Sequence, residues 1–98
     1  MPVYLLTELA RNDLIDIWYY TYFKWSEEQA NLYFHQLILA CQQLAFNPNK
    51  GKSYHFIQSW LLGYRVKRHI IFYRIIGNHR IEVIRILHAQ MDLKNGFK

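Results

Sequence analysis

The chain has 98 residues, of which 52% are hydrophobic and 19% charged, so extensive disorder is excluded. A chain of this length supports one hydrophobic core, and we expect a single domain over residues 1–98. The single cysteine excludes an intrachain disulfide and a metal site built from several cysteines. We expect neither a cofactor nor a metal.

Charge is distributed unevenly along the chain, whose net charge is +5. Residues 1–46 hold two basic and five acidic side chains, whereas residues 47–98 hold ten basic and two acidic ones. This asymmetry predicts an acidic or phosphate-bearing partner for the C-terminal half. No apolar run approaches the ~18–20 residues of a membrane-spanning helix. The N-terminus also lacks the features of a signal peptide, so we expect a cytoplasmic protein that does not contact membranes.

The first half is typical of a short strand followed by two helices. Val3–Leu6 is a β-like run, and the hydroxyl of Thr7 is suited to cap the helix that follows. Ser26 and Gln29 form a capping box for a second helix, so the first helix is expected to end near residues 24–25. Asn-Pro-Asn-Lys-Gly at residues 47–51 ends the second helix. Such a short joint predicts an antiparallel helical hairpin.

The second half changes to a pattern of β-branched and aromatic residues. Three such runs, at 61–68, 69–76 and 81–87, predict an antiparallel meander with turns near 67–69 and 77–80. Strict alternation places Ile84 and Ile86 on one face of the last strand, and Val83, Arg85 and Leu87 on the other. Both faces carry apolar residues, so both are expected to be covered in places.

The predicted fold is therefore a two-layer α+β domain of order β-α-α-β-β-β. A helical hairpin packs on an antiparallel sheet, and a short helical turn ended by Gly96 closes the chain. Apolar residues exposed on the second face or at an edge would need a partner that adds a helix or a strand.

Several segments carry a family resemblance that extends over residues 4–92. They comprise Tyr-Leu-Leu-Thr at 4–7, Trp-Ser at 25–26, Gly-Tyr-Arg at 63–65 and Ile-Phe-Tyr-Arg-Ile at 71–75. The most specific segment is Arg-Ile-Leu-His at 85–88, followed by Met91 and Asp92. Together these segments resemble the ParE toxins, within the ParE/RelE superfamily of bacterial type II toxin–antitoxin systems.

The resemblance implies the ParE/RelE-like fold and a toxin that inhibits DNA gyrase without being an enzyme. It also implies a cognate, ParD-like antitoxin whose C-terminal segment wraps round the toxin. Relatives of the RelE kind instead cleave mRNA on the ribosome, which is the main alternative. A third alternative is a non-enzymatic nucleic-acid-binding module, and direct contact with nucleic acid is otherwise a secondary expectation.

The nuclease alternative needs an acid or base near phosphate-binding cations. The candidates are His88 with Arg65, Arg74 and Arg85, but no tyrosine follows Tyr73. A structural role for His88, pinning the tail by a hydrogen bond, is the favoured interpretation.

For binding to the target or partner we expect the basic sheet and the tail to be used. The candidate residues are Arg65, Arg68, Arg74, Arg85, His88, Met91 and Asp92. If the register brings the arginines together they form a cationic patch, and if it scatters them they only aid solubility.

Other chemistry-bearing residues favour structural roles. Cys41 lies on the apolar stripe of the second helix and is expected to be buried. Trp18 and Trp25 are expected to brace the hairpin, while Trp60 is either a loop anchor or an exposed contact. The remaining histidines lack the spacing of a metal site.

Overall fold

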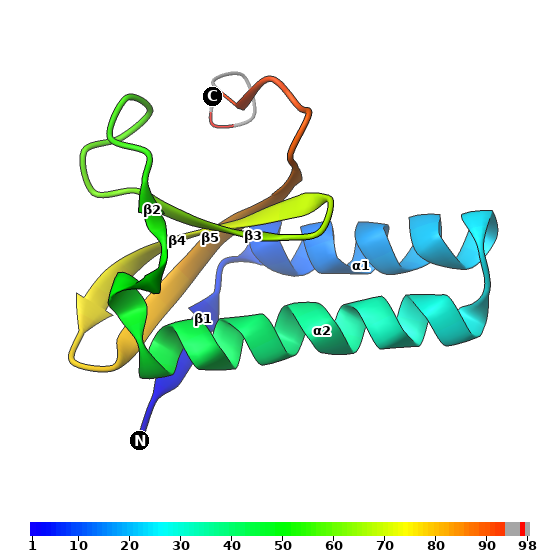
Figure 1. The fold of residues 1–98 in the computed structure, drawn as a ribbon, viewed down its shortest axis with the longest axis horizontal. Helices are drawn as coiled ribbons and strands as arrows, with labels where there is room; N and C mark the ends of the chain where they lie inside the picture. Colours follow the sequence, from blue (N-terminus) through cyan, green and yellow to red (C-terminus); the bar gives the residue numbers. More distant parts are fainter. Residues whose placement is uncertain (94–96, 98) are drawn as a thin grey trace.

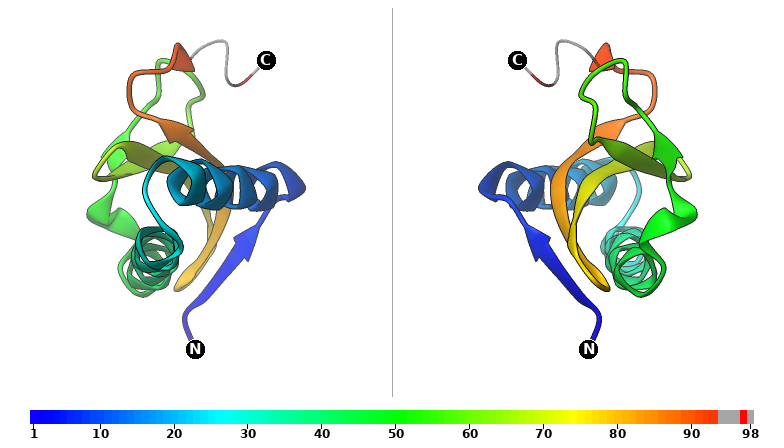
Figure 2. Two further views of the ribbon diagram at one scale, coloured as in Figure 1. Left: turned by 90° about the vertical axis from the view of Figure 1, so that its right-hand side faces the viewer. Right: turned by 90° about the vertical axis from the view of Figure 1, so that its left-hand side faces the viewer.

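The computed structural model describes residues 1–93 and 97 and has two layers. Figure 1 shows the two helices running antiparallel beside a twisted sheet, and Figure 2 shows the same arrangement along the hairpin. The elements are β1 (Val3–Leu6), α1 (Glu8–Lys24), α2 (Glu27–Phe46), the 3₁₀ turn η1 (Pro48–Lys50), β2 (Lys52–Ser53), β3 (Leu62–Val66), β4 (His69–Gly77) and β5 (Arg80–His88).

The helix starts are those that the sequence predicts. The Thr7 hydroxyl oxygen accepts a hydrogen bond from the Ala10 amide at 3.0 Å, and the Ser26 hydroxyl oxygen accepts one from the Gln29 amide at 3.1 Å. The Thr7 hydroxyl also donates to the carbonyl of Ile84 at 2.7 Å, which ties the start of α1 to β5. Each cap satisfies an N–H group that the first helical turn leaves unpaired.

The sheet is mixed, with the strand order β1-β5-β4-β3-β2. The meander of β3, β4 and β5 is antiparallel as predicted, but β1 lies parallel to β5, with Val3 opposite Arg80. The expectation of a wholly antiparallel sheet is therefore wrong at this edge, and β2 was not expected. Pairing of β1 depends on residues distant in the chain, which local patterns do not specify.

A β-bulge in β5 overturns the predicted alternation of its side chains. Phe72 pairs with Arg85 but Tyr73 pairs with Val83, which leaves Ile84 as an extra residue on β5. Val83 and Ile86 therefore both pack toward the helices, although alternation places them on different faces. Ile84 and Leu87, which alternation also separates, both pack in the cluster on the opposite face.

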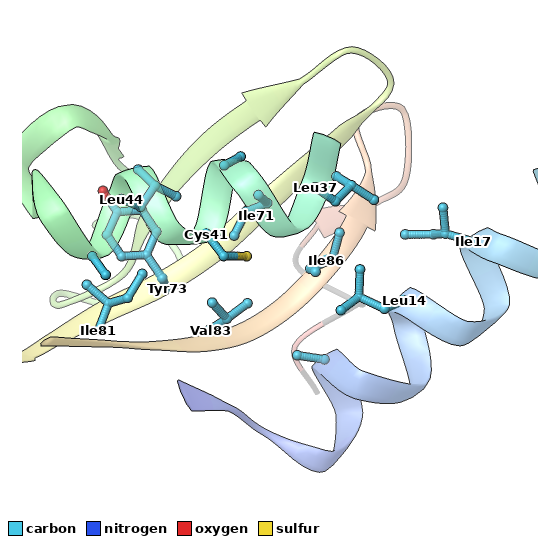
Figure 3. Packing of buried hydrophobic residues seen from close by; sticks show 13 residues of the cluster. Leu14, Ile17, Leu37, Cys41, Leu44, Ile71, Tyr73, Ile81, Val83 and Ile86 are labelled. Atoms are coloured by element: carbon cyan, nitrogen blue, oxygen red, sulfur yellow. The ribbon is translucent and has the colours of Figure 1, made fainter. Parts of the chain in front are cut away.

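The main core lies between the hairpin and the sheet. Figure 3 shows Leu14 and Ile17 of α1 directed toward Leu37 of α2 and Ile86 of β5. The predicted position of Cys41 is confirmed, because it is fully buried and burial raises the pKa of its thiol to about 12. The buried members are Ala10, Leu14, Ile17, Leu37, Ala40, Cys41, Leu44, Ala45, Ile71, Tyr73, Ile81, Val83 and Ile86.

A second, smaller core covers part of the opposite sheet face. Its buried residues are Leu61, Ile70, Phe72 and Leu87. The loop after β2 contributes Tyr54 and Ile57 to this cluster, and the tail contributes Ala89, Leu93 and Phe97. The chain therefore covers part of its own second face, as the apolar residues on both faces of the last strand led us to expect. Gly96, the predicted end of a tail helical turn, lies outside the described residues.

In the part of the chain that the structure describes, neither helix combines the length and apolar character needed to cross a membrane. The same residues hold no cluster of three or more His, Cys, Asp and Glu side chains arranged to hold a metal ion.

Candidate functional site: two grooves beside the helical hairpin

Arg85 forms an ion pair with Asp13 of α1. Its Nε donates to Asp13 Oδ2 at 2.9 Å and its Nη2 donates to Asp13 Oδ1 at 3.0 Å. The Ile86 amide donates to the same Oδ2 at 2.9 Å. The pair therefore joins α1 to β5 at the bulge, and the Asp13 carboxylate raises the pKa of Arg85.

Arg74 lies on the opposite face of the sheet. It donates to Glu82 Oε1 at 2.7 Å, and its guanidinium lies 5.7 Å from the centre of the Trp60 ring. Trp60 is 46% exposed, so it combines a loop position with an accessible ring. Trp60 is therefore an exposed contact, as one of the two expectations had it, and it is not among the residues that pack on either described core cluster.

Arg65 shares this second face but is separated from Arg74. Arg65 lies opposite Ile70, and Arg74 follows four residues later on β4, which places the two rows roughly 13 Å apart. Arg65 Nε donates to the Lys67 carbonyl at 2.7 Å. The three arginines of the strands therefore do not form one patch, and the scattered alternative is the one observed.

The remaining predicted residues lie near the ends of β4 and β5. Arg68 occupies the β3–β4 turn, and its carbonyl accepts from the Ala89 amide at 2.8 Å. His88 Nδ1 accepts from the Gln90 amide at 3.1 Å, in agreement with the favoured role in pinning the tail. Met91 and Asp92 are exposed.

A large groove runs between the hairpin and the β3–β4 turn, and we name it the hairpin groove. Its volume is about 610 Å³, within the range of ligand and peptide sites. The sheet side carries Lys67 and Arg68, and the helix side carries Asp16 and several aromatic rings. The lining residues are Asp16, Ile17, Tyr20, Thr21, Trp25, Gln29, Leu32, Tyr33, Gln36, Lys67, Arg68, His69 and His88.

A hydrogen-bonded cluster forms the inner wall of the hairpin groove. The Tyr33 hydroxyl donates to the Val66 carbonyl at 3.0 Å and lies 2.7 Å from His69 Nδ1. The His69 and His88 rings pack edge to face, with 5.4 Å between the ring centres. Burial, together with His88 and Arg68, lowers the pKa of His69 to about 4 against the opposing effect of Asp13, so the ring is neutral at pH 7.

The rim of the hairpin groove exposes large aromatic side chains. Tyr20, Trp25 and Leu32 are exposed, with Trp25 reaching 62%. Trp18 braces the hairpin as predicted, because its indole N–H donates to Asn31 Oδ1 at 2.9 Å. Trp25 instead ends α1 and turns toward solvent. Clustered exposed aromatic surface of this kind is characteristic of protein interfaces.

A second groove of about 260 Å³ adjoins the first, and we name it the edge groove. It lies between α2 and the outer edge of β3 and shares Gln36 and Lys67 with the hairpin groove. Its lining residues are Gln36, Leu39, Ala40, Gln43, Tyr64, Arg65, Val66 and Lys67.

The residues that the sequence predicts for binding lie on the basic sheet and the tail, and the exposed aromatic side of the hairpin is not among them. A usable signal was present, because Tyr19, Tyr20, Phe23 and Trp25 lie outside the stripe that buries Ala10, Leu14 and Ile17. Apolar residues off the buried stripe of an amphipathic helix indicate a second contact surface.

Comparisons with known proteins agree with this architecture. The model of the family described as the ParE toxin of the type II toxin–antitoxin system, parDE, matches residues 4–93. Toxin ParE1 of Mycobacterium tuberculosis strain H37Rv is 36% identical over 90 residues, which is 92% of each chain. Toxin ParE1 of Caulobacter vibrioides is 34% identical over 97 residues, which is 96% of each chain.

A solved structure described as the chromosomal ParDE TA system from P. aeruginosa shares the fold. Its TM-score is 0.78 at 17% identity, and the match covers 92% of this chain and 98% of that one. The two-layer domain thus has the ParE/RelE-like fold. The chain belongs to the ParE toxin family of type II toxin–antitoxin systems.

Proposed function

We propose that the chain is a toxin that inhibits DNA gyrase and so blocks replication, and that a ParD-like antitoxin neutralises it in the cytoplasm by occupying the hairpin groove. Family membership supports the toxin role. The observation that carries the antitoxin site is the accessible groove of about 610 Å³, rimmed by exposed aromatic residues.

The chemistry of the groove favours a segment that is apolar on one side and acidic on another. Ile17 and Tyr33 supply an apolar floor, Leu32 adds an apolar side chain at the rim, and Lys67 and Arg68 lie along the sheet side. An amphipathic helix buries its apolar face in such a groove, while carboxylates on its flank pair with the two cations.

A non-enzymatic mechanism is supported by the separation of the nuclease candidates. Arg85 binds Asp13 of α1, and the ring of His88 contacts the ring of His69. Both side chains therefore lie toward the helix side of the sheet. Arg65 and Arg74 lie on the other face. Four groups divided between two faces cannot act on one phosphate.

For contact with gyrase we propose the second sheet face and the tail. Arg65, Arg68, Arg74, Met91 and Asp92 form the accessible part of the predicted set. Arg85 and His88 contribute indirectly, the first by holding α1 on β5 and the second by holding the tail.

The first experiment adds the purified chain to gyrase and a supercoiled plasmid. Linear DNA that needs both gyrase and the chain supports the proposal. Its absence, together with cleavage of translated mRNA that is lost in His88→Ala, would establish the nuclease alternative. Salt-sensitive DNA binding without any effect on gyrase would establish the nucleic-acid-binding alternative.

A second experiment tests the antitoxin site by co-expression with the cognate antitoxin. Leu32→Glu places a carboxylate in the hairpin groove, where we expect it to repel an acidic segment and prevent neutralisation. The matched control is Leu9→Glu, because Leu9 is also an exposed helical leucine but does not line the groove. Equal neutralisation of both variants would place the antitoxin elsewhere.

A further inference from the structure

We infer that the second sheet face binds single-stranded DNA, with bases stacked on exposed rings of the loop at residues 54–61 and phosphates held by a row of separated cations. This inference rests on the proposed function, since it names the DNA held by gyrase as part of what this face contacts. We name the surface the loop face, and its members are Lys52, Phe56, Trp60, Arg74 and Arg80. No residue of the loop lines either groove.

The loop presents flat rings to solvent from a fixed position. Trp60 is 46% exposed and Phe56 is 58% exposed. The Tyr54 amide donates to the Leu61 carbonyl at 2.9 Å, which closes the loop, and the Tyr54 ring packs edge to face on the buried Phe72. Figure 1 shows the loop, drawn in green after β2, projecting from the sheet away from α2. Exposed rings held in this way provide stacking surfaces for any base.

Lys52 and Arg74 place exposed positive charges beside these rings. Lys52 and Phe72 lie in one row of the sheet, since each is opposite Gly63. Arg74 follows Phe72 by two residues, so it lies on the same face, roughly 7 Å further along the strand. Its guanidinium lies 5.7 Å from the centre of the Trp60 ring. A ring for a base thus adjoins a charge for a phosphate, which is the combination that single-strand sites use.

Arg80 extends the row of charges across β5. It lies two residues before Glu82, which is opposite Arg74, so it shares their face one row further along the strand. Arg80 is exposed. Glu82 is the only acidic residue in the five strands, and its carboxylate takes one of the five N–H donors of the Arg74 guanidinium. Cations in successive rows are suited to a linear chain of phosphates rather than to one compact anion.

The combination of rings and cations favours a nucleic acid over an acidic peptide. Residues 29–81 contain no aspartate or glutamate and include seven lysines and arginines, so this part of the chain attracts polyanions. Every nucleotide carries both a flat base and a phosphate, whereas a peptide would have to alternate apolar and acidic side chains to match the same surface. In a duplex the bases stack on one another, so their flat faces are not available to Trp60 and Phe56. A single strand is therefore the form that fits.

The first test measures binding of a labelled oligothymidylate of about 12 nucleotides by fluorescence anisotropy. We expect Trp60→Leu to weaken binding at least about fivefold, as loss of one stacked base predicts, and Trp60→Phe to restore most of the affinity. The control is Phe23→Leu, because Phe23 is 77% exposed on α1 and lines neither groove. Equal affinities of Trp60→Leu and Trp60→Phe would overturn the inference.

The second test measures how the same binding depends on salt. Lys52→Gln should reduce the slope of log affinity against log salt concentration by about 0.7, the value for one phosphate contact on a single strand. Lys24→Gln is a matched control, since the Lys24 ammonium lies 5.5 Å from the centre of the Tyr20 ring and the Lys52 ammonium lies 5.7 Å from that of Tyr54. A slope that Lys52→Gln leaves unchanged contradicts a phosphate contact on the loop face.

Competitors and the gyrase assay separate the possible occupants. Tighter binding of a duplex, or of an oligouridylate of equal length, would overturn the assignment to single-stranded DNA. A wild-type chain that binds no oligonucleotide refutes the inference, while linear plasmid in the gyrase assay would still support the proposed function. If Trp60→Leu then abolished the linear plasmid, the loop face would contact the gyrase protein instead. Oligonucleotide binding without linear plasmid refutes the proposed function alone.

Crosslinking of the wild-type chain gives a result that does not depend on any variant folding. An oligonucleotide that contains 5-iododeoxyuridine crosslinks on irradiation to aromatic side chains that stack on the modified base. We expect mass spectrometry to place the crosslink within residues 54–61. A crosslink confined to the two helices would show that the strand binds elsewhere and would overturn the inference.

Discussion

Asp13 on α1 and Arg85 on β5 form a two-bond ion pair at the point where β5 bulges. The pair is largely shielded from water, with side-chain exposures of 13% for Asp13 and 21% for Arg85. The Asp13 carboxylate also accepts the Ile86 amide, so one side chain fixes both the arginine and the strand backbone beyond the bulge. The pair therefore sets the position of α1, which forms one wall of the hairpin groove.

We predict that Arg85→Ala lowers the free energy of unfolding by about 2–3 kcal/mol, because it leaves the Asp13 carboxylate poorly compensated in a shielded site. Asp13→Asn should lower the free energy of unfolding by less than Arg85→Ala, since the amide oxygen of the new side chain can still accept a hydrogen bond from the Ile86 amide. Urea denaturation measures both. The control is Arg74→Ala, which breaks the more exposed pair with Glu82 and should cost less than about 1 kcal/mol. Equal losses for Arg85→Ala and Arg74→Ala would contradict this role.

The elements of this fold that the sequence predicts are those fixed by near neighbours. Thr7 and Ser26 cap helices through residues three positions later, so both helix starts can be recognised from the residue types alone. The parallel pairing of Val3 with Arg80 joins distant segments and leaves no local pattern. The extra residue Ile84 changes which side chains on either side of it face the helices. The residue types in this strand do not indicate a bulge, so the change could not be predicted from them.

The candidate site was only partly predictable for the same reason. Basic residues near the β3–β4 turn could be identified, and Lys67 and Arg68 do line the hairpin groove. The partner of each arginine could not be identified from the sequence, because the pairing of Arg85 with Asp13 depends on how α1 packs on β5. The Oε1 atom of Gln36 is buried without a hydrogen-bond partner among the described residues, and this too depends on how the helices and the sheet pack together.

Acidification should destabilise the chain through His69. Burial, His88 and Arg68 lower its pKa from 6.5 to about 4, although Asp13 acts in the opposite sense. The unfolded chain therefore takes up a proton at His69 more readily than the folded chain. The stability associated with neutral His69 is present above about pH 6.5 and is lost as the pH falls toward 4.

Thermal unfolding at a series of pH values checks this expectation. His69→Gln should flatten the decline in Tm between pH 6.5 and 4, since glutamine does not titrate and can still bond to the Tyr33 hydroxyl. The control is His35→Gln, an exposed position at which the profile should follow that of the wild type. A wild-type profile that persists in His69→Gln would assign the decline to other groups.

Gly51 and Tyr73 form a close contact that should not tolerate a methyl group. The Gly51 amide donates to the Tyr73 hydroxyl oxygen at 3.0 Å, and that hydroxyl donates to the Pro48 carbonyl at 2.7 Å. A Cβ at residue 51 would lie 2.3 Å from the hydroxyl oxygen of this fully buried ring. We predict that Gly51→Ala costs about 1–3 kcal/mol of stability by overpacking.

The matched control for this contact is Gly77→Ala. A Cβ at residue 77 would meet only the flexible Arg80 side chain, with its nearest atom at 3.4 Å, so the change in stability should be small. Neither glycine has a positive φ, so the comparison isolates the contact from backbone strain. Chemical denaturation of the two variants measures the difference, and equal stabilities would show that the Tyr73 ring moves aside at little cost.

Phe97 should protect the second sheet face from solvent. Its ring packs edge to face on the ring of the fully buried Phe72, with 5.0 Å between the ring centres, although the two residues are 25 positions apart in the chain. We predict that Phe97→Ala lowers stability by about 1–2 kcal/mol and increases binding of a hydrophobic dye, because it uncovers Phe72 and its neighbours. Phe56→Ala is the control, since Phe56 is 58% exposed and should contribute less than about 0.5 kcal/mol. If the two variants bind the dye equally, the tail does not act as the cover of this face.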